Sequence, residues 1–259
     1  MKAMLFLLAT TLVFTTNSYA KTLIISDIDD TIKLTDVLNS KPEIVRNALL
    51  SKKAFSGMSQ LYKELGTRET SIHYVSGSPT IIRSIVNKFL QHNEFPQEEN
   101  LVLKRGSIHT FEYKVEAIKN IIFAEKPDEI ILIGDDTEVD PEVYDTISKL
   151  NPLKVSGIYI RAIQNRALPD NGLTRNFFAA VEIAGVEHLK GNLSTAAVSK
   201  ITKSFIDQDK KSQLSIKKRY CPKDGRLEIE ELKQRVSDQS TIDDLEKTQE
   251  KIIKTCSKA

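Results

Sequence analysis

The feature that most constrains the fold is an alternation of short apolar runs with helical patterns between residues 22 and 163. The apolar runs are rich in Ile, Val, Leu or Tyr, which is typical of buried β-strands. Between them, apolar residues recur at helical spacing, so each intervening segment predicts an amphipathic helix. Strands and helices that alternate in this way predict an α/β fold with a parallel sheet. The expected strands are 22–26, 71–75, 100–103, 129–133 and 155–160.

Two regions depart from this alternation. Residues 31–71 form a longer connection that is too short for a large cap domain, so we expect a minimal cap. Beyond residue 163 the patterns are helical, with moderately apolar helices expected at 175–190 and 194–206. We therefore expect a catalytic-type domain at 21–163 and a helical C-terminal extension at 164–259.

Residues 1–20 carry the pattern of a secretory signal peptide. Lys2 is the single charge, and the apolar stretch 4–14 is too short to span a bilayer comfortably. Small residues at Ser18 and Ala20 predict cleavage after Ala20; a buried N-terminal helix is the alternative. We therefore expect a mature protein that is periplasmic or secreted.

Cys221 and Cys256 are the two cysteines of the chain. They flank two amphipathic helices expected at about 226–237 and 241–255, and an antiparallel hairpin would bring them together. In an oxidising compartment such a pair can form a disulfide, which we predict here; two unpaired thiols are the alternative.

The composition excludes some classes of function. With 259 residues, 40% hydrophobic and 28% charged, the chain is ordinary for a globular protein. Its net charge of +2 lacks the basic bias of a dedicated nucleic-acid binder, so no nucleic-acid partner is expected. The histidines have no partners at ligand spacing, which argues against a zinc site.

An acidic run, Ser-Asp-Ile-Asp-Asp-Thr at 26–31, directly follows the first expected strand. Open α/β sheets bind ligands at the carboxyl ends of their strands. Asp27 and Asp29 are two residues apart, so in an extended chain they point the same way. One carboxylate can attack while the other handles protons, an arrangement that suits phosphoryl transfer through an aspartyl-phosphate.

Further polar groups follow the later strands in chain order. They are Ser76, a lysine (Lys114 or Lys104), and the Gly134-Asp135-Asp136 turn with Asp140 just beyond it. A hydroxyl with its neighbouring N–H groups can hold phosphate oxygens, and a lysine can neutralise their charge. A carboxylate nucleophile needs shielding from the phosphate, for which Mg²⁺ with oxygen ligands is suited. We expect the Asp27 and Asp135 carboxylates and the backbone carbonyl of Asp29 to supply those ligands.

Together these motifs resemble the haloacid dehalogenase-like phosphohydrolase superfamily, whose fold is a Rossmann-like parallel sheet with flanking helices. The resemblance is closer to one branch, the actin-patch-type phosphatidate phosphatase catalytic domain, and covers about 22–163. It is carried by the segments Ser26–Lys33, Gly57–Leu65, His73–Pro79, Leu132–Asp135, Asp140–Tyr144 and Ile158–Arg161.

The resemblance implies a role for each matching residue. Asp27 becomes the nucleophile, Asp29 the general acid and base, and Lys114 fits the lysine motif better than Lys104 because it begins the helix before the fourth strand. Thr31, although expected mainly to shape the loop, belongs with the phosphate-binding group. The implied sets are Thr31, Ser76, Gly77 and Lys114 for phosphate, Asp27, Asp29 and Asp135 for metal, and Asp136 and Asp140 as supporting acids. Asp136 departs from the family, which more often has serine there.

Several residues keep a structural alternative. Asp140 precedes Pro141 and can cap the helix that begins there. Arg161 can serve a substrate or a structural salt bridge, and His73 is expected to be a packed core residue. The basic tract 210–219 is either a solvated face or a peripheral contact with phospholipid headgroups.

The leading hypothesis is a Mg²⁺-dependent phosphatase acting on phosphatidate or a related membrane lipid phosphate. The alternative is the same chemistry on a phosphoprotein, sugar phosphate or nucleotide. A non-catalytic module of receiver type is a third hypothesis, but such modules carry their phospho-acceptor on a middle strand. An inactive scaffold is a fourth, and it is disfavoured because the expected groups are all present.

Overall fold

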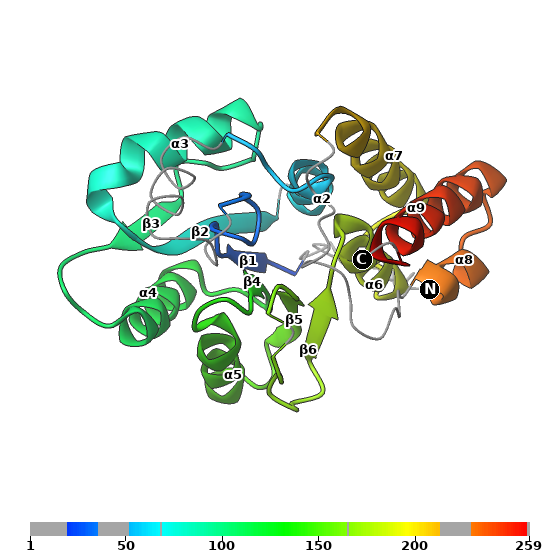
Figure 1. The fold of residues 1–259 in the computed structure, drawn as a ribbon. Helices are drawn as coiled ribbons and strands as arrows, with labels where there is room; N and C mark the ends of the chain where they lie inside the picture. The colour runs from blue at the N-terminus through cyan, green and yellow to red at the C-terminus, as the bar shows by residue number, and fades with distance from the viewer. Residues whose placement is uncertain (1–19, 36–51, 68, 165, 213–228, 258–259) are drawn as a thin grey trace, which may run out of the picture.

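A six-stranded sheet forms the centre of the protein (Figure 1). We describe it from a computed structural model that defines residues 20–35, 52–67, 69–164, 166–212 and 229–257. Every pair of neighbouring strands is parallel. The strands are β1 (Thr22–Ser26), β2 (Thr70–Pro79), β3 (Leu101–Lys104), β4 (Glu129–Asp135), β5 (Val155–Arg161) and β6 (Thr174–Phe177).

The strand order is β3-β2-β1-β4-β5-β6, so chain progression reverses between β1 and β4. In doubly wound sheets of this order, ligands bind beyond the carboxyl ends of the two strands at the reversal. Asp27 follows β1 directly and Asp135 ends β4. The topology therefore places these two carboxylates at the expected ligand-binding position.

Helices cover both faces of the sheet, giving the predicted α/β architecture (Figure 1). Side chains alternate along β1: Leu23 and Ile25 pack in the core under α4 and α5, whereas Ile24 packs in the core on the opposite face. The helices are α2 (Met58–Leu65), η1 (Thr80–Ile82), α3 (Arg83–His92), α4 (Thr110–Glu125), α5 (Asp140–Leu150), α6 (Ala180–Leu189), α7 (Thr195–Ser212), α8 (Ile229–Arg235) and α9 (Gln239–Ser257).

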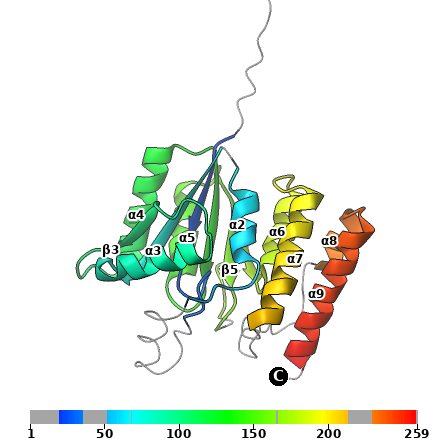
Figure 2. The same cartoon turned by 90° about the horizontal axis from the view of Figure 1, so that it is seen from above.

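The C-terminal helices extend the hydrophobic core on the face of the sheet to which the Ile24 side chain points. One buried hydrophobic cluster runs without a break from Ile24 to Ile252. Within it α7 packs on α2 and α6, α9 packs on α7, and α8 packs on α6 and α9. Figure 2 shows these helices side by side, outward from α2. The expected helical extension is present, and it lies against the sheet domain.

The sixth strand was not expected. We predicted a helix from residue 175, but β6 occupies Thr174–Phe177 and α6 begins only at Ala180. β6 is a short edge strand with Arg175 and Asn176 exposed, so its sequence shows no alternation of buried and exposed residues. Its backbone pairing with β5 determines the strand, and that pairing is not visible in the local pattern.

Some sequence-based predictions fall outside the described residues. These are the signal peptide at 1–20, apart from its last residue, and most of the basic tract 210–219. The disulfide is a third, because Cys221 and the side chain of Cys256 are not described. The described hairpin helices α8 and α9 do pack against each other. Among the described helices, none combines the length and apolarity needed to cross a bilayer.

Candidate active site

Asp27 is fixed at the carboxyl end of β1. Its backbone N–H donates to the carbonyl of Ile133 at 2.9 Å, which extends the β1–β4 pairing by one residue. Its side chain is buried, and its Oδ1 lies 2.8 Å from the ammonium Nζ of Lys114. This lysine lies in the second turn of α4 and is itself buried. The structure thus places Lys114 beside Asp27, whereas Lys104 donates to Thr110 at 3.2 Å.

The chain turns sharply after Asp27 instead of continuing as a strand. The N–H groups of Ile32 and Lys33 both donate to the carbonyl of Ile28, at 3.0 and 2.9 Å, and Asp30 adopts a left-handed φ of 56°. Aspartate is among the non-glycine residues that tolerate this conformation. The turn brings Thr31 back toward β4, where its hydroxyl donates to Oδ2 of Asp135 at 2.9 Å. Thr31 is buried and is absent from the lining of the catalytic cavity described below.

Asp29 lies on the other side of this turn, beside the loop end of β2. Its Oδ2 accepts hydrogen bonds from the hydroxyls of Ser78, at 2.9 Å, and Ser76, at 3.4 Å. The Ser76 hydroxyl also accepts from the N–H of Ser78 at 3.0 Å, which fixes the loop. Ser78 was not predicted as a site residue, although it lies in the Ser76-Gly77-Ser78 segment that we singled out.

The third wall comes from the end of β4 and the start of α5. Asp140 contacts the Lys114 ammonium, and its Oδ2 accepts from the N–H of Asp135 at 3.4 Å. Its expected alternative role as a helix cap is not found, because α5 begins at Asp140 and has no side-chain cap. Gly134 allows Asp140 to pack close to the end of β4, since a Cβ at residue 134 would lie 2.7 Å from Asp140 Oδ2.

Asp136 points away from these groups. Its Oδ1 accepts from the backbone N–H groups of Ile163 and Gln164, both at 2.8 Å, and its Oδ2 accepts from that of Arg166 at 3.3 Å. Asp136 therefore anchors the segment that follows β5.

Arg161 also has a structural position. Its Nε donates to the carbonyl of Thr31 at 3.0 Å and its Nη1 to that of Phe178 at 2.6 Å. The guanidinium lies over the rings of Phe55 and Phe177. Because it is buried among these groups, Arg161 holds the Thr31 loop to the C-terminal segment.

The side chains of Asp27, Asp29, Ser76, Lys114 and Asp135 meet around one cavity of about 220 Å³. Gly77 also lines it, and a Cβ there would lie 2.8 Å from Thr110 Cγ2. The remaining lining residues are Ser78, Pro79, Thr137 and Glu138. Sequence reasoning missed Thr137 and Glu138, although both lie in the predicted Asp135–Asp140 loop.

The electrostatics of the cavity favour a bound cation. Burial raises the pKa of Asp27 well above the ordinary carboxyl value, against the pull of Lys114, and Asp140, Asp135 and Asp29 raise it further. Burial, together with Asp140, raises the pKa of Asp135 to about 7. Burial alone would lower the pKa of Lys114, but Asp140 and Asp27 outweigh it and hold that pKa well above the usual lysine range. Lys114 thus stays charged among carboxylates that outnumber it.

Asp27, Asp135 and Asp140 can each offer one oxygen to a common metal ion, since these atoms lie within 4.8 Å of one another. A divalent cation would offset their excess charge, and hard cations prefer such oxygen donors. The donor set therefore fits a metal. Asp140, expected as a supporting acid, joins this side-chain group, whereas the Asp29 carboxylate lies at Ser78.

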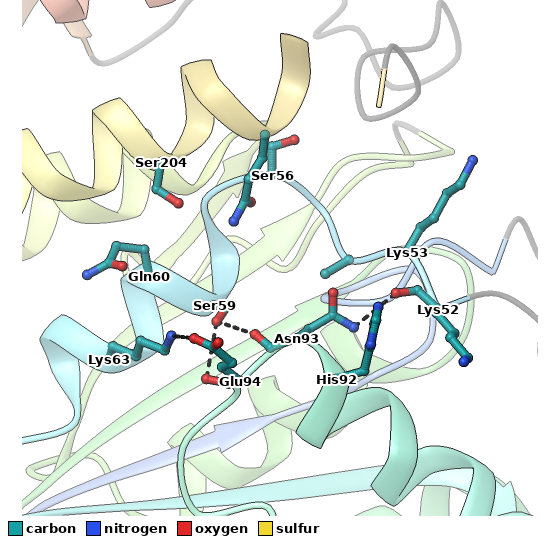
Figure 3. A pocket seen from close by; sticks show the side chains of 12 residues that line it. Lys52, Lys53, Ser56, Ser59, Gln60, Lys63, His92, Asn93, Glu94 and Ser204 are labelled. Carbon is teal, nitrogen blue, oxygen red and sulfur yellow. Dashed lines mark hydrogen bonds and ion pairs between the residues drawn. The ribbon is translucent and has the colours of Figure 1, made fainter. Parts of the chain in front are cut away.

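A second, more open cavity of about 590 Å³ lies between α2, the end of α3 and α7 (Figure 3). Its lining is polar, and Lys52 and Lys53 extend outward from its rim. The segment at its rim is joined to the loop after β1 by backbone hydrogen bonds: Leu34 N–H donates to Lys53 O, and Phe55 N–H donates to Ile32 O, both at 2.9 Å. None of the predicted site residues lines it.

The fold and the acidic cavity define a parallel α/β domain with a metal-binding capacity at its carboxyl edge. Residues 22–162 match the family model described as phosphatidate phosphatase APP1, catalytic domain. Because this match covers more than half of the chain, the chain belongs to that family.

Two curated relatives each match about half of the chain. Phosphatidate phosphatase APP1 of Saccharomyces cerevisiae is 31% identical over 154 residues, covering 55% of this chain and 26% of the yeast protein. An uncharacterized protein of Schizosaccharomyces pombe is 26% identical over 152 residues, covering 55% of this chain and 25% of that protein. The chain thus spans about a quarter of the length of these relatives.

Among solved structures, the class C acid phosphatase from Bacillus anthracis matches at 15% identity with a TM-score of 0.38, covering 54% of this chain and 66% of that one. The same enzyme with tungstate bound matches at 15% identity with a TM-score of 0.36, over the same shares of both chains. This likeness is too distant to bear on substrate or mechanism.

Proposed function

We propose that this chain is a metal-dependent phosphomonoester hydrolase that forms an aspartyl-phosphate on Asp27. The observation that carries the proposal is the buried Asp27 carboxylate, 2.8 Å from Lys114, in a cavity that Asp29 shares. Lys114 orients the carboxylate and lowers its negative charge toward an incoming phosphate. The family to which the chain belongs supports phosphatase activity.

The reaction takes place in two steps. An oxygen of Asp27 attacks phosphorus while the bond to the leaving oxygen breaks, and a protonated Asp29 donates its proton to the departing alkoxide. Asp29, now ionised, then takes a proton from water, whose oxygen attacks phosphorus, releasing inorganic phosphate and restoring the Asp27 carboxylate. We propose that Ser76, Ser78 and the N–H groups of their loop hold the phosphate oxygens, since both serines line the cavity. Asp29 already contacts that loop.

The metal we propose is Mg²⁺, held by Asp27 and Asp135 with support from Asp140. When bound, it would neutralise negative charge on the phosphate and on its protein ligands. Thr31 and Thr137 both donate to Asp135 and so orient that ligand. The expected contribution of the Asp29 carbonyl remains a prediction.

For the substrate we propose phosphatidate or a related lipid phosphate, because the family model and the named yeast relative are both phosphatidate phosphatases. Soluble phosphomonoesters, including a phosphoprotein, a sugar phosphate or a nucleotide, are the alternative. The test measures phosphate release from phosphatidate vesicles and from a panel of soluble phosphates, with Mg²⁺ and with a chelator.

We expect Mg²⁺-dependent release that is fastest from phosphatidate and absent in Asp27→Asn. Faster release from a soluble ester would favour the alternative substrates. A lack of release from every compound in the presence of Mg²⁺ would rule out the hydrolase.

Export and membrane contact are further proposals, supported by the signal-peptide pattern at 1–20 and the basic tract 210–219. The exported protein should begin at Lys21 and should contain a Cys221–Cys256 disulfide, both measurable by mass spectrometry without reduction. Vesicle binding should weaken when Lys217, Lys218 and Arg219 are replaced by Ala. Two free thiols, an uncleaved N-terminus or unchanged binding would count against the respective proposal.

A further inference from the structure

A groove of about 570 Å³ lies beside edge strand β3, along helix α4. Four of the side chains that α4 contributes, Tyr113, Ala117, Ile121 and Ala124, recur at spacings of three and four and so share one face of the helix. Figure 1 shows α4 below the β2–β3 end of the sheet. We name this cavity the β3–α4 groove.

The opposite wall is the edge strand β3, followed by Ile108, which is 49% exposed. Of the strand side chains, Val102 packs on the same core as α4, whereas Leu101 and Leu103 are buried in the core on the other face of the sheet.

The α4 wall also includes the polar residues Glu116 and Asn120. Along α4, Ala117 is half-buried and Ala124 is exposed, so small side chains leave the hollow open. From Tyr113 to Ala124 the helix rises about 16 Å, which gives the length of the groove.

One end of the groove adjoins the catalytic cavity. In the sheet register, Ser76 pairs with Leu103 and Pro79 with Lys104, so the β2 loop that lines the catalytic cavity lies next to the groove end of β3. On α4, Tyr113 of the groove directly precedes Lys114 of the catalytic cavity. Strand β2 and helix α4 therefore each contribute residues to both the groove and the catalytic cavity.

The charges of the groove also suit a chain that carries a phosphate at one end. Arg105 lies directly after β3, at the end near the catalytic cavity. Burial raises the pKa of Tyr113 to about 12. Lys114, Arg83 and Arg105 lower this pKa and Asp27 raises it, so the phenol interacts with charged groups of both cavities.

The far end of the groove is closed by charged groups. Glu125 lies 3.0 Å from His73 Nε2 and 2.7 Å from the ammonium of Lys21. An apolar chain gains nothing by extending into these groups, so the groove has a limited apolar length.

We propose that the β3–α4 groove binds the apolar chain of a phosphate-bearing lipid whose phosphate occupies the catalytic cavity. The inference rests on the proposed function, because that function places the phosphate. Substrate selectivity then depends on a surface outside the acidic motifs: the groove favours esters with a linear apolar chain over compact polar ones.

The test measures the affinity of linear alkylphosphonates, from ethyl to tetradecyl, by titration calorimetry of the full chain with Mg²⁺. Phosphonates carry a C–P bond that hydrolysis of phosphate esters does not break, so binding is measured whether or not the chain is an active hydrolase. Each methylene buried should raise affinity by at most about fourfold, from ~0.8 kcal/mol per CH₂. We expect the gain to level off when the chain reaches the Glu125 end.

The variant Ala117→Phe fills the groove and should flatten the dependence on chain length, so the octyl-to-ethyl affinity ratio falls by at least tenfold. Ala196→Phe is the matched control, since Ala196 is exposed on α7, and it should keep the wild-type ratio. Ala124→Phe, at an exposed position of the groove, provides a second test if Ala117→Phe does not fold.

Equal affinities across the series in the wild-type chain would overturn the inference, and so would a ratio that the groove variants leave unchanged. These results are separable from failure of the proposed function. If the protein releases no phosphate from any ester but binds longer alkylphosphonates more tightly, only the hydrolase proposal fails. If it releases phosphate but binds all phosphonates equally, only the groove proposal fails.

Discussion

Lys114 and Asp27 form a buried ion pair, with 2.8 Å between Nζ and Oδ1. The lysine comes from the helix before β4 and the carboxylate from the end of β1, so the pair connects two elements that are distant in sequence. Asp140 contacts the same ammonium. Lys114 therefore compensates two buried carboxylates at once.

Replacing Lys114 with Met should lower both the rate of phosphate release and the free energy of unfolding. Breaking a buried pair leaves uncompensated carboxylates and typically costs about 3–5 kcal/mol of unfolding free energy. Loss of the cation at the reacting group should lower kcat by ~10²-fold or more. Urea denaturation and phosphate release measure the two effects.

Lys119→Met is the control, because Lys119 is exposed on the same helix and should tolerate the change. Near-normal turnover in Lys114→Met would show that the pair has no part in the chemistry.

Replacing Thr31 with Val should weaken metal binding without removing a metal ligand. The Thr31 hydroxyl donates to Asp135 Oδ2 at 2.9 Å. Loss of a hydrogen-bond partner that orients a metal ligand typically lowers metal affinity by roughly 10- to 100-fold. The measurement is the Mg²⁺ concentration that gives half-maximal activity. Thr146→Val, whose hydroxyl bonds within α5, should leave that concentration unchanged.

The neighbouring aspartates 135 and 136 should behave differently when each is replaced by Ala. Asp136→Ala removes the acceptor of three backbone N–H groups, so we expect a loss of about 1–3 kcal/mol in unfolding free energy with unchanged Mg²⁺ dependence. Asp135→Ala should abolish the Mg²⁺ response. An equal loss of Mg²⁺ dependence in both variants would contradict the structural assignment of Asp136.

The stability of the metal-free protein should depend on pH through Asp135. Its folded-state pKa of about 7 lies above the unfolded value of about 3.9, so the folded protein binds more protons between these values. Stability from this group is therefore lost as pH rises from about 4 to about 7. Because Mg²⁺ binds the ionised carboxylate, stabilisation by Mg²⁺ should be larger at about pH 7.5 than at about pH 5.

Thermal unfolding of the wild-type chain and of Asp135→Asn, with and without Mg²⁺, isolates this contribution. If Mg²⁺ raises the unfolding temperature of the wild-type chain by the same amount at both pH values, Asp135 does not make this contribution.

Much of the site was predictable because it follows the strand ends. The apolar runs fixed the positions of β1 and β4, and the first residue after β1 and the last residue of β4 are Asp27 and Asp135. Parallel pairing then brings these ends together. From the residues alone, Lys114 was one of two candidate lysines. The family resemblance favoured it over Lys104, and the structure places it beside Asp27.

The rest depends on tertiary contacts that no local pattern encodes. Asp29 turns to Ser78 because the chain leaves the extended conformation after Asp27, whereas our expectation assumed that it stayed extended. Asp136 faces the segment after β5, although its sequence neighbour faces the cavity. Glu138 lines the cavity from the short connection between β4 and α5.

If Asp27 carries the phosphoryl group, mass spectrometry of acid-quenched protein after incubation with substrate and Mg²⁺ should detect it there. In Asp29→Asn, loss of the base that activates water should let the intermediate accumulate. We expect one covalent phosphate on the peptide that contains Asp27, and none when Asp27→Asn is added. Turnover retained in Asp27→Asn, or phosphate found on a different residue, would contradict this expectation.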